Sequence, residues 1–101
     1  MNDVVAWLER EARDAPESLR ARMLAAVDPA MNESIQNLLA AAAFNCLRAA
    51  AAHPENAAQD LLCADALLTH ACAAAAADGD AELKRFTAAC DAHLFQQLLP
   101  A

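Results

Sequence analysis

The sequence predicts an all-α protein, an antiparallel bundle of five helices, and three features of its composition support this. Thirty of the 101 residues are alanine and only one is glycine. Valine and isoleucine together number four, and tyrosine is absent, so the residues that favour strands are scarce. Alanine, leucine, glutamate and arginine lose little entropy in a helix. One domain covering residues 1–101 accounts for this length.

Prolines and the single glycine divide the chain into its helices. Pro16, Pro29 and Pro54 each suit the first turn of a helix, and Asp28 is placed to cap the helix that begins at Pro29. Gly79 suits a left-handed helix end. Short connections make successive helices antiparallel. We therefore expect two short helices followed by three long ones, at 2–14, 16–27, 29–52, 54–77 and 80–99.

Apolar residues three or four positions apart assign a core-facing side to each helix. On the fourth helix this side carries Leu61, Leu68 and Cys72, whereas Cys63 and His70 share a side that we expect to face solvent. The other expected core positions are Val4, Val5, Leu8, Leu19, Met23, Val27, Met31, Ile35, Leu38, Leu39, Ala42, Cys46, Ala49, Leu83, Phe86, Cys90, Leu94 and Leu98.

The third helix carries a second apolar stripe on the side opposite Ile35. The stripe contains Ala40, Phe44, Leu47 and Ala51. Either the first two helices cover it or a partner chain does. Large apolar side chains number only 25 in the whole chain, and small domains with thin cores gain burial by association. Phe44 and Leu47 are therefore candidate partner-binding residues in a homodimer.

Two polar residues fall where a core is expected. Asp65 lies about 40° from the apolar side of the fourth helix, and a buried carboxylate needs a partner. If the fifth helix folds back along the fourth about Gly79, position 65 lies level with position 93. We therefore predict a polar core pair between Asp65 and His93, either a structural hydrogen bond or a functional pair that acts in acid–base chemistry or supports a metal ligand.

The four cysteines and three histidines show no spacing typical of a zinc site. We expect free, reduced thiols and no metal or cofactor. If a metal or redox centre were present, the candidates would be Cys46, Cys90 and His93. A metal-binding or redox bundle is thus the first alternative function.

Arg48 and His53 are separated by four residues, a spacing that also occurs in the helical HEPN ribonucleases. A chain of this composition contains about 0.5 such pairs by chance. The match covers six residues and crosses the helix end that Pro54 imposes. We assign no family on it, and a ribonuclease centred on Arg48 and His53 is the remote alternative.

Charge and hydropathy limit the partners further. A net charge of −7 argues against nucleic acid, which requires a basic surface. The most apolar stretch, 61–77, is interrupted by Asp65 and His70, so we expect no membrane span. The acidic N-terminus lacks the features of a signal peptide, and we expect a cytoplasmic protein. The leading hypothesis is a small interaction module, an adaptor or accessory protein without catalytic activity, which binds itself or another protein.

Overall fold

A computed structural model describes residues 3–98, except for the side chains of Leu94, Phe95, Gln97 and Leu98. The described chain is 82% helical and contains no strand, which confirms the all-α fold class. The expected core positions Leu94 and Leu98, and the expected helix end at 99, lie outside the described part. The helices are α1 (Val4–Glu11), α2 (Glu17–Ala26), α3 (Ile35–Ala52), the short 3-10 helix η1 (Pro54–Asn56), α4 (Ala57–Ala77) and α5 (Asp80–Leu98).

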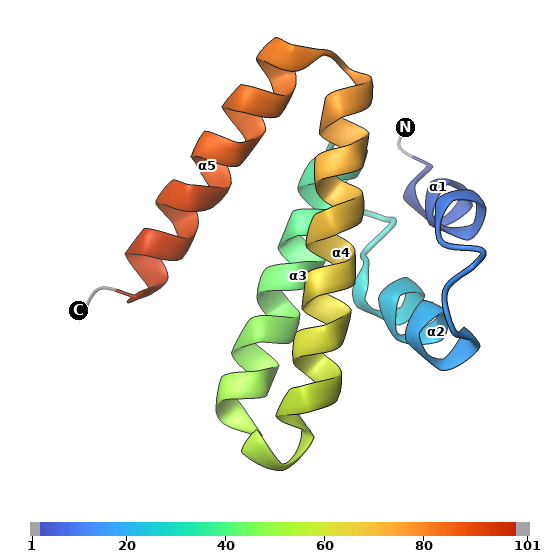
Figure 1. Ribbon diagram of the computed structural model, residues 1–101, viewed down its shortest axis with the longest axis vertical. Helices are drawn as coiled ribbons and strands as arrows, with labels where there is room; N and C mark the ends of the chain where they lie inside the picture. The colour runs from blue at the N-terminus through green and yellow to red at the C-terminus, as the bar shows by residue number, and fades with distance from the viewer. Residues whose placement is uncertain (1–2, 99–101) are drawn as a thin grey trace.

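A hairpin of α3 and α4 forms the centre of the molecule, and the two helices lie side by side (Figure 1). Helices α1 and α2 pack on one side of this hairpin, and α5 lies on the other. The α5 helix begins close to the end of α4 and then diverges from the hairpin along its length. It therefore does not pack along α4 over its whole length.

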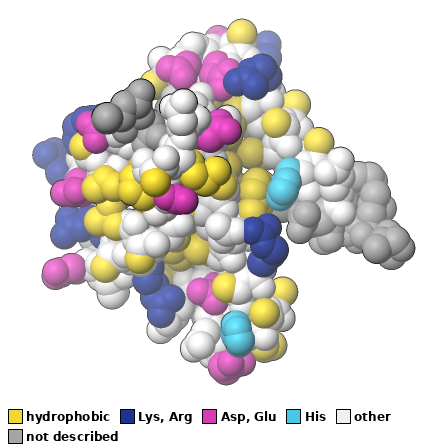
Figure 2. All heavy atoms as spheres, turned by 180° about the vertical axis from the view of Figure 1, so that it is seen from behind, with side chains coloured by type: hydrophobic (Ala, Val, Ile, Leu, Met, Phe, Trp, Pro, Cys, Tyr) yellow, Lys and Arg dark blue, Asp and Glu magenta, His cyan; other side chains and the backbone are white. Residues whose placement is uncertain are grey.

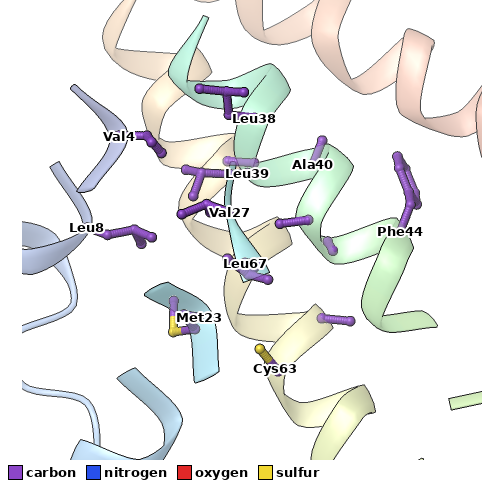
Figure 3. Packing of buried hydrophobic residues seen from close by; sticks show 14 of the residues in the cluster. Val4, Leu8, Met23, Val27, Leu38, Leu39, Ala40, Phe44, Cys63 and Leu67 are labelled. Atoms are coloured by element: carbon purple, nitrogen blue, oxygen red, sulfur yellow. The ribbon is translucent and has the colours of Figure 1, made fainter. Parts of the chain in front are cut away.

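Alanine makes the close contact between α3 and α4 possible. Small side chains allow two helix axes to approach toward ~8 Å, the short end of the usual range. Leu39 of α3 and Leu67 of α4 are fully buried in this contact, and Figure 3 shows Leu8 and Met23 pointing toward the same core from α1 and α2. The buried alanines of the hairpin are Ala40, Ala42, Ala43, Ala50, Ala64, Ala71, Ala74 and Ala75.

The N-terminal helices cover the side of α4 that we expected to face solvent. Trp7 of α1 meets His70 edge-on, with ring centroids 5.9 Å apart. Arg22 of α2 lies 3.7 Å from the Asp60 carboxylate. Cys63 is consequently 2% exposed, so its predicted exposure was wrong. Periodicity shows which residues share a side, but it does not say which sides neighbouring helices cover.

The start of α3 also differs from the prediction. The helix begins at Ile35, where the Ser34 hydroxyl caps it by accepting a hydrogen bond from the Asn37 backbone N–H at 3.2 Å. The Asp28 carboxylate instead accepts from the Ala30 N–H at 3.1 Å and stabilises a turn. Because residues 29–34 are not helical, Met31 is 48% exposed and was wrongly placed in the core.

Helix α4 has an apolar composition that needs a structural explanation. Pro54–Ala77 is long and apolar enough to cross a membrane, judged by length and composition alone, with a mean hydropathy of 1.3. In the structure this helix packs against α2, α3 and α5. Only 33% of the apolar window is buried in the single chain, so part of the apolar surface of this helix remains exposed.

The alanine contact predicts that enlarging one of its residues destabilises the fold. We expect Ala43→Leu to lower the free energy of unfolding by about 1–3 kcal/mol, because Ala43 is fully buried and added methyl groups force the helices apart. Urea denaturation measures the change. The control Ala51→Leu adds the same group at an exposed position of α3 and should be nearly neutral. Equal losses in both variants would contradict the close-contact model.

Candidate functional site

A groove separates α5 from α3, and we call it the α3–α5 groove. Its volume is about 310 Å³. Apolar atoms line most of it, and polar side chains gather at its edges. Figure 2 shows the notch from behind, with a histidine and a basic side chain beside apolar atoms. The apolar lining residues are Ala40, Ala41, Phe44, Phe86, Ala89 and Cys90, and the polar ones are Asn37, Asn45, Arg48 and His93.

An aromatic contact closes the floor of the groove. The rings of Phe44 and His93 have centroids 4.2 Å apart and an interplanar angle of 34°. Phe44 is 9% exposed, and Leu47 is partly buried against the core. The expectation that α1 and α2 cover this stripe was wrong, because His93 of α5 lies against Phe44. A partner chain at Phe44 and Leu47 stays a prediction. The first two helices pack on the other side of the hairpin.

Two polar groups at the groove have unusual surroundings. The His93 Nε2 atom is buried and has no hydrogen-bond partner. Such an atom keeps its desolvation penalty without compensation. Arg48 is exposed, and its guanidinium donates to the Asn45 side-chain carbonyl. Among the described lining residues, Arg48 alone has a permanent charge.

A buried glutamine fixes the start of α5. Gln36 is 4% exposed, and its Nε2 donates to the Asp78 carboxylate at 3.2 Å and to the Glu82 carboxylate at 2.7 Å. Arg85 donates to the other Glu82 oxygen at 2.6 Å. The hydrogen bond from Gln36, followed by that from Arg85, lowers the pKa of Glu82 below its ordinary value of 4.5. We call the two hydrogen bonds from Gln36 the clamp. The sequence gives no local signal for it, because the partners lie 42 and 46 residues from Gln36.

The predicted Asp65–His93 core pair is wrong. Asp65 is exposed, and the contact recorded for it is a hydrogen bond from the Thr69 hydroxyl to its backbone carbonyl at 2.9 Å. The register argument assumed that α5 lies along α4, whereas α5 diverges and brings His93 against Phe44 of α3. The same divergence leaves Leu61 49% exposed, so its placement in the core was also wrong.

The four cysteines are free, and the structure places them at helix–helix contacts. Burial, followed by the neighbouring Cys46 thiol, raises the pKa of Cys63 to about 12. Burial, followed by Cys72, also raises the pKa of Cys90. The metal candidates are not brought together, because Cys46 lies beside Cys63 whereas Cys90 and His93 line the groove. Among the described residues no three histidine, cysteine or acidic side chains form a group that could hold a metal.

The contacts of Arg48 and His53 do not join these two residues. Arg48 bonds to Asn45 within α3. His53 follows the end of α3, is exposed, and lies with its Nδ1 3.6 Å from the Glu55 carboxylate. The structure therefore adds no contact that would support a ribonuclease site.

The clamp predicts a specific pH dependence of stability. The lowered pKa of Glu82 stabilises the fold above pH 4.5, and this contribution is lost as the pH falls through the folded-state pKa. Glu82→Gln should therefore lose less thermal stability than the wild type as the pH falls below 4.5. Thermal denaturation at several pH values measures this. Glu9→Gln, an exposed change on α1, should follow the wild-type curve; parallel losses in all three proteins would contradict the clamp.

Burial and the raised pKa predict that Cys63 reacts last with a thiol reagent. Alkylation requires both access and the thiolate form, and Cys63 has little of either. Mass spectrometry of alkylated peptides over time should show Cys63 labelled after Cys46, Cys72 and Cys90, which are partly exposed. Denaturant should remove the difference. If Cys63 reacts as fast as Cys46 in native protein, α2 does not cover this side of α4.

Comparison of the chain with protein-family models, curated proteins and solved structures gives no match. A functional assignment therefore rests on the α3–α5 groove, on the chemistry of its lining and on the apolar side chains that remain exposed.

Proposed function

We propose that this chain is a small helical protein-interaction module, an adaptor or accessory protein without catalytic activity, that forms a homodimer. The observation that supports this is a pair of adjacent leucines at the start of α4. Leu61 is 49% exposed and Leu62 is 56% exposed. We call these two side chains the α4 patch. Exposed apolar side chains that lie together are typical of interaction surfaces.

The surroundings of the α4 patch suit a partner that is a second copy of the chain. Beside Leu62 lies a pocket of about 360 Å³, lined by Ser18, Leu19, Arg22, Gln59 and Leu62 itself. In a two-fold symmetric dimer the same surface meets itself, so a leucine of one protomer can enter the pocket of the other. Near the patch, Arg22 pairs with Asp60 of the same chain, and the exposed Asp65 adds a charged group for a polar rim around such a contact.

A thin core gives the chain a reason to associate. Among the described residues, the largest fully buried side chains are Leu8, Met23, Leu39, Leu67, Val4 and Cys63, and alanine supplies much of the remaining core. Small domains with little buried apolar area commonly gain stability by association. Burying the α4 patch in a dimer interface would increase the apolar area that is removed from water.

The chemistry of the groove supports binding rather than catalysis. Cys90 and His93 both line it, which is the pairing that a nucleophilic thiol and a base would require. Burial raises the pKa of Cys90, however, and so disfavours the reactive thiolate. The raised pKa also disfavours a metal-binding or redox function of this thiol, because the thiolate is the form that binds metals and reacts.

The four free thiols support a cytoplasmic location as part of this proposal. Disulfides persist in oxidising compartments, whereas the cytosol keeps thiols reduced. An acidic surface with a net charge of −7 supports a protein partner rather than nucleic acid or an anionic membrane.

The proposal predicts a dimer in solution that single changes on the α4 patch disrupt. Sedimentation at micromolar concentration should show a dimer for the wild type and a folded monomer for Leu61→Glu and for Leu62→Glu. Both side chains are exposed in the single chain, so a charge there should disrupt the dimer and leave the helical circular dichroism intact.

Ala76→Glu is the control, because it places the same charge on an exposed position near the other end of α4. It should remain dimeric. A monomeric wild type would refute the homodimer, and patch variants that stay dimeric would refute this interface.

A further inference from the structure

The α3–α5 groove is long and narrow. Along α3 its lining runs from Asn37 to Arg48, a distance of ~17 Å at the helical rise per residue. A volume of about 310 Å³ lies at the small end of the range for pockets that bind small molecules. The mostly apolar lining suits the alkyl or aromatic body of such a ligand.

The lining separates an apolar length from a polar end. Phe44 and Phe86, with alanines of both helices, supply the apolar walls. Arg48 lies about one turn beyond Phe44 at the end of the groove, and its partner Asn45 directly follows Phe44. A planar guanidinium is well suited to bind a carboxylate through charge-assisted hydrogen bonds.

The charge of the groove contrasts with that of the whole chain. The protein has a net charge of −7, yet the described lining residues include Arg48 and no acidic side chain. An anion would therefore meet attraction at this position and repulsion over much of the remaining surface.

From these dimensions and charges we propose that the α3–α5 groove binds a small amphiphilic carboxylate, with its apolar body between Phe44 and Phe86 and its carboxylate at Arg48. Fatty acids of medium length and aryl-alkyl carboxylates share this chemistry. The site is separate from the α4 patch, so this inference does not depend on the homodimer. It adds a ligand to a protein for which we propose an interaction role.

Calorimetric titration of the full chain with decanoate tests the proposal. We expect saturable binding with one ligand per chain. Decanol has the same apolar chain without the charge. Its affinity should be lower by a factor of at least about ten, because a charge-assisted contact at Arg48 is lost. Arg48→Gln should weaken decanoate by a similar factor and leave decanol nearly unchanged. Phenylbutyrate in a second titration distinguishes an alkyl from an aryl body.

Two adjacent alanines of α5 provide a matched steric control. Ala89 lines the groove and Ala88 does not, and both are exposed. Ala89→Trp should fill the groove and abolish decanoate binding, whereas Ala88→Trp should bind like the wild type. Leu62→Glu should also bind like the wild type, which separates this site from the α4 patch.

Three outcomes would overturn the proposal. The first is the absence of decanoate binding at millimolar concentration. The second is equal affinity for decanol and decanoate, which would mean that Arg48 does not receive the carboxylate. The third is equal loss of binding in Ala88→Trp and Ala89→Trp, which would place the ligand elsewhere on α5.

Discussion

The close approach of α3 to α4 is the contact on which the rest of the molecule depends. Alanines such as Ala43 and Ala71 are fully buried between the two helices, and their small size allows the backbones to come together. The resulting hairpin has two broad sides. One side receives α1 and α2 through larger residues such as Leu8 and Met23. The other side receives only part of α5.

The hydrogen bonds at one end of the hairpin decide the position of α5. Gln36 reaches from α3 to both Asp78 and Glu82, and so ties the end of α4 and the start of α5 to the start of α3. Farther along α5, His93 packs against Phe44 of α3, and α5 no longer follows α4. The groove and the exposed Leu61 are two consequences of this one geometry. Both of our functional proposals therefore depend on how α5 is held.

The errors of the sequence-based predictions share a physical cause. Periodicity correctly grouped Leu61, Leu68 and Cys72 on one side of α4, but only the part near the Gly79 turn is covered by α5. It likewise placed Cys63 and His70 on one side, and it could not show that α1 and α2 would cover that side. Local patterns report the angle between residues on one helix. They contain no information about the angle at which another helix crosses.

The sequence by itself determined the helical class, the helix ends near Pro54 and Gly79, and many core residues, among them Leu39 and Phe86. These features arise from local preferences: alanine and leucine favour helix, proline and glycine interrupt it, and apolar residues recur with the helical repeat. Only the tertiary structure decided that Gln36 clamps α5, that Phe44 meets His93, and which apolar side chains remain exposed. Those outcomes depend on contacts between residues more than 40 positions apart, whose geometry follows from the packing of the whole chain.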